Sequence, residues 1–495
     1  MAKVAAYGLP YPHPTSAEVT ARMRANRQTD TKPEIQLRSA LHRLGFRFRK
    51  EYPVRAGGRT RRVDIAFPRE KLAVFVDGCF WHSCPEHGTT PAANAAYWIP
   101  KLEKNVARDK ATTQALEAEG WSVLRLWEHV PCADAAAAVA TTVDAIRGAC
   151  RPTAIDLFAG AGGSTQGMSD AGYRVVAAVE NDESAGRSYS SNHPGVALLD
   201  DDIQDVSPSE MRTSLGLDRG ALGLLVACPP CQGFSTLGLS DEDDPRNDLV
   251  SIVQPFVEEF LPSAFLLENV PGLRGDERLA ALVEWARSAG YGVRSYVVNA
   301  TSFGVPQSRR RLIVVGVHGL DEEVFPTDLS DVLPRRFKQP VPNVLDVLMA
   351  AGSIEGSADP IHRSRQSSPT VLARIRKIPP GGGRFDLPEE HQLACHKSME
   401  KRNATAAYGR IRLDGPAPTM TTRCTTPACG RFVHPTEDRG ISLREAALIQ
   451  TFPPRYRFYG SHQSLEAQIG NAVPVRMAEA LSAVAMTLAE ASRNG

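Results

Sequence analysis

The sequence has few cysteines, no long apolar run and almost no net charge, and each shortage excludes a class of protein. Nine cysteines in 495 residues are too few, and odd in number, for a disulfide-stabilised secreted fold. No run approaches the roughly 20 apolar residues of a membrane-spanning helix, and the first 14 residues lack the apolar core of a secretory signal. We therefore expect a folded cytoplasmic protein of bacterial type, with reduced thiols and no membrane contact.

The net charge of +1 conceals two basic regions. Residues 1–150 hold 22 Lys and Arg against 15 Asp and Glu, which leaves 35 against 41 for the rest. The excess is concentrated in residues 22–62, with thirteen basic and three acidic residues, and in 334–431, with sixteen and eight. Because phosphate neutralisation is the main source of nucleic-acid affinity, these regions suggest a polyanionic partner. A solvated charged face would give the same counts.

The length predicts several domains, and the first of them has mixed α/β periodicity. Apolar residues recur at helical spacing over 32–46, and later segments alternate between strand-like and helical patterns. The expected elements are strands 63–67, 72–77 and 121–127 and helices 94–119 and 133–147. Arg151-Pro152 is a plausible junction, because proline disfavours helical geometry in the residue before it.

Beyond this junction, strands alternate with helices, which predicts a parallel doubly wound sheet that binds ligands at the carboxyl ends of its strands. The expected strands are 153–158, 174–180, 221–228, 264–270, 294–300 and 311–317. Residues 318–410 break the pattern, because they are rich in Pro, Arg, Ser and Gly, and predict a loop-rich insertion. Helical periodicity returns at 442–450 and 474–489.

Several chemically distinctive residues fall at the predicted strand ends. The glycine-rich turn at 156–163 lets backbone amides approach a ligand, and Glu180 is placed to bind ribose hydroxyls. Cys228-Pro-Pro-Cys231 does not suit a zinc site, because no second pair of cysteine ligands lies nearby, and it fits a redox-active cysteine pair only loosely. A single nucleophilic cysteine fits better. Glu268 ends another strand, and the three arginines 309–311 precede the last one, where they suit an anion.

Taken in order, these motifs resemble those of the DNA (cytosine-5) methyltransferases, over residues 153–317 and 411–485. The matching motifs are Asp-Leu-Phe-Ala-Gly, Pro-Cys-Gln, Glu-Asn-Val, Gln-x-Arg-x-Arg, the stretch 412–422 and Gln468-Ile-Gly-Asn-Ala-Val-Pro474. The resemblance implies S-adenosylmethionine as methyl donor and a cytosine flipped out of double-stranded DNA as acceptor. The catalytic motifs alone do not exclude RNA.

The same resemblance implies a role for each matching residue. Cys231 would add to cytosine C6, Glu268 would hold or protonate N3, and Arg309 and Arg311 would stabilise developing negative charge. The implied donor-binding residues are Asp156, Phe158, Gly160, Gly162, Glu180, Asp202, Pro230, Leu249 and Asn471. Among these, Phe158 would stack near the adenine, Glu180 would hold the ribose and Asp202 would reach the adenine amine. The insertion stands where the family carries its target-recognition region.

The amino-terminal region contains candidate ligands for two metals. Cys79, Cys84, His87 and His129 could supply the four ligands of a closed tetrahedral zinc site, with Cys132 as a competing fourth ligand. Asp64 lies in a predicted strand. Together with Glu34, His82 and the basic face, Asp64 favours a Mg²⁺-dependent phosphodiesterase site, in which a carboxylate binds the metal and a histidine handles the proton.

This region resembles the very short patch repair (Vsr) endonucleases, over residues 17–130. The matching residues are Arg22-Met23-Arg24, Thr31 to Glu34, Val63-Asp64, Gly78 to His82, Tyr97-Trp98, Lys104 to Asp109 and Gly120-Trp121. The family nicks DNA beside the thymine of a T:G mismatch. The resemblance implies Asp64 as metal ligand and His82 as catalytic histidine, with Glu34, Asn105 and Asp109 in support. Met23, Phe80 and Trp81 would wedge into the base stack, although both aromatic residues could be core.

The two resemblances together predict an α/β chain with two activities. We expect a tail at 1–16, a zinc-containing restriction-endonuclease-like domain at 17–150 and a Rossmann-like methyltransferase domain at 151–317. A small target-recognition domain would follow at 318–461, and 462–495 would return to the catalytic domain. Deamination of 5-methylcytosine creates the T:G mismatch, so one half would correct the mutational risk that the other half creates.

Two other interpretations of the amino-terminal domain remain open. It could be a non-catalytic DNA-binding module, or it could cut unmethylated DNA in a restriction-modification fusion. We expect double-stranded DNA as partner, mismatch-repair proteins as further partners and a monomeric chain.

Overall fold

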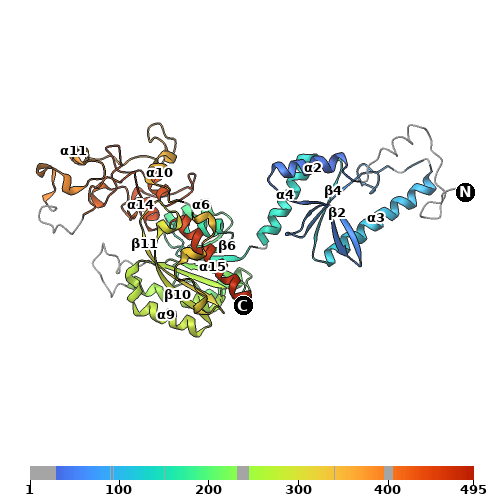
Figure 1. The fold of residues 1–495 in the computed structure, drawn as a ribbon, viewed down its shortest axis with the longest axis horizontal. Coiled ribbons are helices and arrows are strands. Elements are labelled where there is room, and N and C mark those ends of the chain that lie inside the picture. The colour runs from blue at the N-terminus through green and yellow to red at the C-terminus, as the bar shows by residue number, and fades with distance from the viewer. Residues whose placement is uncertain are drawn as a thin grey trace. The chain divides into compact units, whose positions relative to one another are not determined.

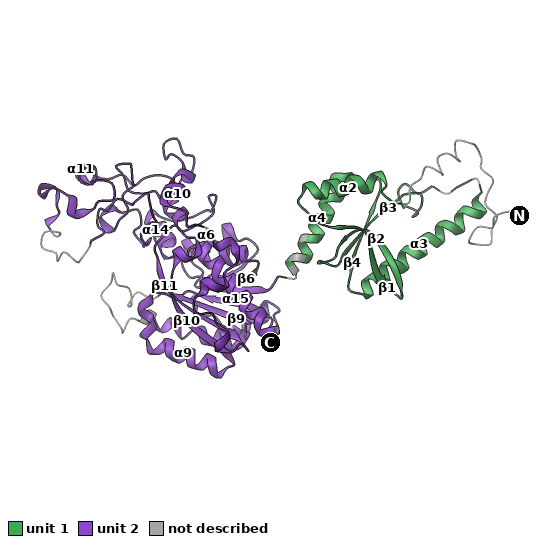
Figure 2. Ribbon diagram, viewed as in Figure 1, with its two compact units in different colours: residues 1–150 green, residues 151–495 purple. Residues whose placement is uncertain are grey.

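The computed structural model describes residues 29–494 except 90, 93, 150, 231–244, 339 and 395–404. It divides into two compact units, residues 1–150 and 151–495, which Figure 2 shows in different colours. The division coincides with the Arg151-Pro152 junction.

Unit 1 is a four-stranded sheet between two helical layers. Its strands are β1 (Arg49–Ala56), β2 (Arg59–Phe67), β3 (Leu72–Asp77) and β4 (Ser122–Trp127), in that order across the sheet. The first three are antiparallel, and β4 runs parallel to β3. Helices α2 (Lys32–Arg43) and α4 (Cys132–Ala149) cover one face, and α3 (Ala95–Ala118) covers the other (Figure 1).

The period-2 alternation of β3 explains the two layers. Leu72 and Val74 pack toward α2 and α4, whereas Ala73 and Phe75 pack toward α3, because successive side chains point to opposite faces. Strand β1 was not expected from the sequence. Among its eight residues only Val54 and Ala56 are buried, and the run of charged residues conceals the apolar pattern of a strand.

Unit 2 is built on a seven-stranded sheet. Its strands are β5 (Thr153–Leu157), β6 (Arg174–Val179), β7 (Ala197–Leu199), β8 (Leu222–Ala227), β9 (Ala264–Asn269), β10 (Tyr291–Asn299) and β11 (Arg310–His318). Their order across the sheet is β10-β11-β9-β8-β5-β6-β7. The expected parallel arrangement holds for the pairings among β5 to β9, but β11 runs antiparallel to both β9 and β10. The segment 300–309 between β10 and β11 is too short for a helical crossover, so it forms a hairpin connection instead.

Helices cover both faces of this sheet (Figure 1). They are α5 (Gly163–Ala171), α6 (Glu183–Asn192), α7 (Pro208–Ser214), α8 (Val253–Phe260), α9 (Glu277–Ser288) and α15 (Val475–Asn494). Helices α5 and α15 share one apolar cluster with the sheet, and α8 and α9 share the other. The carboxyl-terminal helix therefore packs on the unit's first helix, where Gly167 is required: a Cβ atom there would lie 2.5 Å from the Cβ of Ala478.

One helical stretch of the described chain, His462–Arg493, is long and apolar enough to cross a membrane. Its apolar window is 72% buried inside the protein, as in the core helix of a globular domain. No other helix of the described residues has both the length and the apolarity.

In its described residues the insertion is loop-rich, as expected, and the helices found there are short. They are α10 (Val344–Ala351) and α11 (Pro369–Lys377), followed in the chain by α13 (Leu443–Ile449) and α14 (His462–Asn471). The 3₁₀ turns of unit 2 are η1 (Pro245–Val250), η2 (Pro271–Gly275), η3 (Ala300–Phe303), η4 (Glu322–Val324), η5 (Leu329–Val332), η6 (Arg335–Phe337), η7 (Arg384–Asp386), η8 (Glu389–His391) and η9 (Pro427–Cys429). Helices α10, α13 and α14 contribute to one apolar cluster, which also includes Ala161 of the glycine-rich turn and Val475 of α15.

Close packing across β9 and β11 gives a test of the fold. Gly316 pairs with Phe265, and a Cβ atom on Gly316 would lie 2.0 Å from the Phe265 ring. We expect Gly316→Ala to destabilise unit 2 by about 1–3 kcal/mol, the usual cost of overpacking, measured as a lower midpoint of thermal unfolding. Gly195→Ala is the control, because no described atom lies within 4 Å of the position that its Cβ atom would take. Equal midpoints for the two variants would contradict this packing.

Candidate active sites

The glycine-rich turn between β5 and α5 has an unusual backbone. Phe158, Gly160 and Gly162 all have positive φ, at 61°, 56° and 94°. This conformation costs glycine little but strains a bulky residue such as Phe158. The turn therefore presents its backbone closely and holds one aromatic side chain in a strained geometry, as often occurs at ligand-binding loops.

Asp156 supports this turn from inside the protein. Its buried carboxylate accepts hydrogen bonds from Ser164 Oγ at 2.6 Å and Thr165 Oγ1 at 2.5 Å, at the start of α5. Burial raises the pKa of Asp156 to about 6. The carboxylate therefore ties the end of β5 to the first turn of α5.

Two further acidic residues lie at the same edge of the sheet. Glu180 directly follows β6 and accepts hydrogen bonds from the amides of Gly160 and Asp182, both at 2.8 Å. Burial raises the pKa of Glu180. Asp202, which follows β7, is exposed and accepts a hydrogen bond from Asn181 Nδ2 at 3.3 Å. Glu180 is thus fixed against the glycine turn, while Asp202 is open to solvent.

The ends of β8 and β9 are joined by a buried amide. Asn269 Nδ2 donates to the carbonyl of Pro229 at 3.1 Å, and its Oδ1 accepts from the Val270 amide at 2.7 Å. The Glu-Asn-Val motif therefore anchors the chain immediately before Pro230, which is exposed. The predicted nucleophile, Cys231, follows Pro230 and lies outside the described residues. Leu249, in η1, is half-buried.

Glu268 and Arg311 form an ion pair on neighbouring strands. Arg311 Nε lies 2.9 Å from Glu268 Oε1, and the two side chains are only 14% and 13% exposed. The antiparallel pairing of β9 with β11 brings them together. A carboxylate and a guanidinium thus meet at the carboxyl end of β9 with little access to water.

Arg309 is placed differently from Arg311, although the motif match implies the same role for both. Its buried guanidinium donates from Nη1 to the carbonyls of Met420 and Gly470, at 2.9 and 3.1 Å, and from Nη2 to that of Asn471 at 3.5 Å. Burial and the neighbouring Arg311 lower the pKa of Arg309 to about 9. Arg309 therefore fastens the chain before β11 to two distant segments. The Asn471 side chain itself is exposed.

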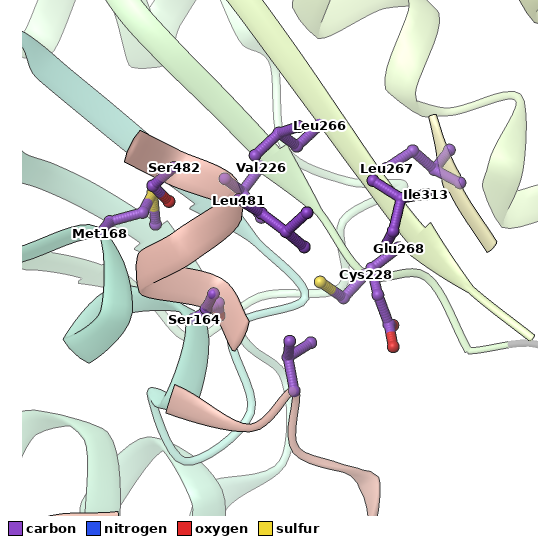
Figure 3. Close-up of a pocket in the computed structure, with 12 residues that line it drawn as sticks. Ser164, Met168, Val226, Cys228, Leu266, Leu267, Glu268, Ile313, Leu481 and Ser482 are labelled. Carbon is purple, nitrogen blue, oxygen red and sulfur yellow. The ribbon is translucent and has the colours of Figure 1, made fainter. Parts of the chain in front are cut away.

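A small cavity lies behind this edge of the sheet (Figure 3). Cys228 and Glu268 line it together with Ser164 and with apolar side chains from α5, β9 and α15. Its volume of about 20 Å³ would hold no more than a water molecule, so it is not a cofactor pocket. Burial raises the pKa of the Cys228 thiol, which suits the expected packing role of this residue rather than nucleophilic attack.

In unit 1, the four predicted zinc ligands come together. The ligand atoms of Cys79, Cys84, His87 and His129 all lie within 4.8 Å of one another. His129 Nδ1 is 3.1 Å from Cys79 Sγ and 3.7 Å from Cys84 Sγ. Zinc bonds of about 2.0–2.3 Å in a tetrahedral site place ligand atoms at separations of about 3.3–3.8 Å. The donor set therefore fits zinc, with His129 rather than Cys132 as its fourth member.

Asp64, on β2, lies near several other carboxylates. Its Oδ2 accepts a hydrogen bond from the Val76 amide at 2.9 Å. Burial raises the pKa of Asp64 to about 7, and the carboxylates of Glu34, Glu51 and Asp77 contribute. Several carboxylates close to one another form a favourable environment for a divalent cation.

Glu34, a predicted supporting residue, forms hydrogen bonds at the start of α2. It is buried in the first turn of α2 and accepts hydrogen bonds from Thr31 Oγ1 at 2.7 Å and from the Asp30 amide at 3.1 Å. Its carboxylate therefore stabilises the helix start while it adds negative charge near Asp64.

His82 is held between two carboxylates. Its Nδ1 lies 2.5 Å from Asp109 Oδ2 and 3.5 Å from Asp77 Oδ1. Burial opposes ionisation of Asp109, but His82 and Arg125 lower the pKa of this carboxyl. Since Nδ1 is engaged, Nε2 is the ring nitrogen that can exchange a proton with a substrate.

Sequence reasoning missed three of the residues around Asp64 and His82. Arg125 holds Asp77 through two hydrogen bonds of 2.7 Å, from Nε and Nη2. The position of Asp77 directly before the Gly78 to His82 motif was a usable signal. Arg125 and Glu51 gave none, because their proximity depends on how β1 to β4 are paired.

The predicted wedge residues lie in an aromatic cluster. The rings of Phe80 and Trp81 are 5.1 Å apart, and each is 5.9 Å from the Trp98 ring. Both side chains are half-buried, and Asn105 Nδ2 donates to the Trp81 carbonyl at 3.1 Å. Insertion of Phe80 and Trp81 into DNA stays a prediction. Met23 lies outside the described residues.

The ligand cluster of unit 1 generates a direct test. We expect Cys84→Ser to abolish stoichiometric zinc in the purified full-length protein and to lower the unfolding midpoint of unit 1, because structural zinc contributes folding energy. Metal analysis and a thermal melt measure the two effects. Cys132→Ser should keep both the zinc and the midpoint. Loss of zinc from the Cys132 variant alone would assign the fourth ligand to that thiol.

Comparisons with known proteins match each unit to a family. The family model of C-5 cytosine-specific DNA methylases matches residues 153–485, and that of the DNA mismatch endonuclease Vsr matches residues 14–86. The chain is 34% identical over 336 residues to the type II methylase M.HgiDII of Herpetosiphon aurantiacus, which covers 66% of this chain and 93% of that protein.

Two further relatives extend this pattern. Type II methyltransferase M.AgeI of Thalassovita gelatinovora is 30% identical over 424 residues, covering 66% of this chain and 97% of its own. The type II nicking enzyme V.NaeI of Lentzea aerocolonigenes is 51% identical over 134 residues, covering 27% of this chain and 81% of its own. Methylase relatives thus match one part of the chain, and a nicking enzyme matches a shorter part.

Proposed function

This chain belongs to the C-5 cytosine-specific DNA methylases and also carries a Vsr-type endonuclease domain, so it is a bifunctional methylase and nicking enzyme. From this premise we propose a mechanism for each of the two sites. Unit 2 methylates cytosine C5 within a specific DNA sequence. Unit 1 nicks one strand of DNA at T:G mismatches. The two reactions act on the same kind of site, since deamination of 5-methylcytosine produces thymine opposite guanine.

The glycine turn and the acidic residues of unit 2 suit the methyl donor that the family implies, S-adenosylmethionine. When bound, it supplies a methyl group on a sulfonium centre. Glu180, fixed by two amides, would accept hydrogen bonds from the ribose hydroxyls, and exposed Asp202 would bind the adenine amine. Strained Phe158 would stack on the adenine. Pro230, Leu249 and Asn471 would complete the pocket.

The Glu268–Arg311 pair is the observation that carries the methyl-transfer proposal. Cys231 would attack cytosine C6 as a thiolate, while Glu268 holds or protonates N3 and so draws charge from the ring. C5 would then take the methyl group from the donor, and loss of the C5 proton would release the thiolate of Cys231. Arg311, 2.9 Å from Glu268, orients the carboxylate and stabilises negative charge on the base. We assign Arg309 to positioning instead of catalysis, because its guanidinium donates to three backbone carbonyls. The target base must leave the duplex to reach this edge.

The carboxylates around Asp64 and the His82–Asp109 contact carry the nicking proposal. Asp64 would bind Mg²⁺, which activates a phosphodiester for hydrolysis, and His82 would transfer a proton through Nε2. Glu34 adds charge, and Asp109 orients the imidazole. Zinc would hold the loop that carries His82, because this residue lies between Cys79 and Cys84 in the sequence. We propose double-stranded DNA as the substrate and a monomer as the acting species.

Separate sites predict separable losses. Cys231→Ser should abolish methyl transfer from tritiated S-adenosylmethionine to DNA and leave nicking unchanged, because a hydroxyl is a far weaker nucleophile than a thiolate at neutral pH. Cys228→Ala is the matched control and should retain transfer, since this thiol lines an apolar cavity. Transfer by the Cys231 variant at the wild-type rate would refute the covalent mechanism.

The nuclease site predicts the reverse pattern. Asp64→Asn should abolish Mg²⁺-dependent nicking of a labelled T:G duplex and preserve methyl transfer, because an amide binds the cation weakly. Asp134→Asn, at an exposed position on α4, should nick normally. The substrate is identified by assaying a matched unmethylated duplex and a T:G duplex side by side. Cutting of the matched duplex would indicate restriction, and no cutting of either would indicate a DNA-binding module.

A further inference from the structure

The glycine turn of unit 2 rests on a buried hydroxyl and a buried imidazole. Tyr456 Oη lies 2.6 Å from the carbonyl oxygen of Ala161, and His193 Nε2 lies 2.8 Å from the same hydroxyl. Both side chains are buried, at 3% and 8% exposure. A Cβ atom on Gly162 would lie 2.7 Å from each of these two polar atoms. The hydroxyl and the imidazole therefore contact the turn directly.

The direction of these hydrogen bonds follows from the groups involved. A carbonyl oxygen only accepts, so Tyr456 donates its single hydroxyl proton to Ala161. The contact between His193 and Tyr456 then requires a proton on Nε2. Burial lowers the pKa of His193 to about 4, so the ring is neutral and carries that proton as the Nε2–H tautomer. The chain His193 to Tyr456 to Ala161 is fully specified.

The two supporting residues come from segments that are also tied to each other. His193 is the residue that caps the carboxyl end of α6, the helix that begins three residues after Glu180. The segment containing Tyr456 is bound to α6 at two further places, where the amides of Arg457 and Tyr459 donate to Asn192 Oδ1 at 3.0 Å and Ser188 Oγ at 2.8 Å. The segment that carries Tyr456 is therefore tied to α6, the helix that follows Glu180, the proposed ribose-binding carboxylate.

We propose that Tyr456 is a positioning residue for the methyl donor: it holds the Ala161 carbonyl and thereby fixes the turn whose Gly160 amide binds Glu180. His193 aligns the Tyr456 hydroxyl. Neither residue touches the donor or the base. This inference rests on the proposed function of the turn and adds a requirement that the methylase motifs do not contain, namely a hydroxyl delivered from residue 456.

The test compares donor affinity with turnover in the full-length protein. Tyr456→Phe should raise the Kd for S-adenosylmethionine and S-adenosylhomocysteine about five- to tenfold by calorimetry, because it leaves a buried carbonyl unsatisfied. The kcat at saturating donor should stay within about twofold of wild type, as should the Kd for DNA. His193→Ala should behave similarly, and His193→Gln, which keeps an N–H donor, should recover most of the affinity.

Tyr459→Phe is the matched control, because it removes a hydroxyl from the same segment. This hydroxyl lies 3.4 Å from Ser191 Oγ and is not bonded to the turn. Equal donor affinities for the Tyr456 and Tyr459 variants would overturn the proposal. A parallel loss of donor binding, DNA binding and thermal stability in Tyr456→Phe would also overturn it, because it would show a merely structural role. If the wild-type chain bound neither compound, the proposed function of the turn itself would fall.

Discussion

The proposed active edge of unit 2 depends on one buried guanidinium. Arg309 donates to the carbonyls of Met420, Gly470 and Asn471, which are more than a hundred residues away in the chain. Loss of a buried charge's partners is costly, so these bonds hold the chain before β11 and both distant segments in one arrangement. Arg311, two residues later, is thereby placed beside Glu268. The geometry around Glu268, the proposed base-binding carboxylate, thus depends on contacts between segments that are far apart in the sequence.

Much of the architecture was predictable because it follows from local patterns. Strand-helix alternation and the motifs at strand ends placed Glu180 and Glu268 at one edge of the sheet. The antiparallel β11 was not predictable from periodicity, because strand direction depends on the connection between β10 and β11 and not on the residues within each strand. Likewise, the motif match gives Arg309 and Arg311 the same role. Only the tertiary packing shows that Arg309 is buried and binds backbone carbonyls, whereas Arg311 pairs with Glu268.

Unit 1 shows the same division between local and non-local information. The spacing of Cys79, Cys84, His87 and His129 identified a ligand set that the fold brings within 4.8 Å. The clamp of Arg125 on Asp77 was invisible, because it depends on the pairing of β3 with β4, strands that lie on either side of the long helix α3 in the sequence. The proposed catalytic side chains lay in recognisable motifs, as did Asp109 and Arg309, whereas Arg125 lay in none.

The edge strand β1 also bears on how the protein behaves at high concentration. Open strand edges expose unpaired amides and carbonyls that can recruit another chain into a shared sheet. Here Arg49, Lys50 and Arg55 crowd the strand with positive charge, and Pro53 removes one amide from the row. Two copies of unit 1 would therefore repel each other along this edge, which disfavours the joining of two sheets and so protects the unit from aggregation.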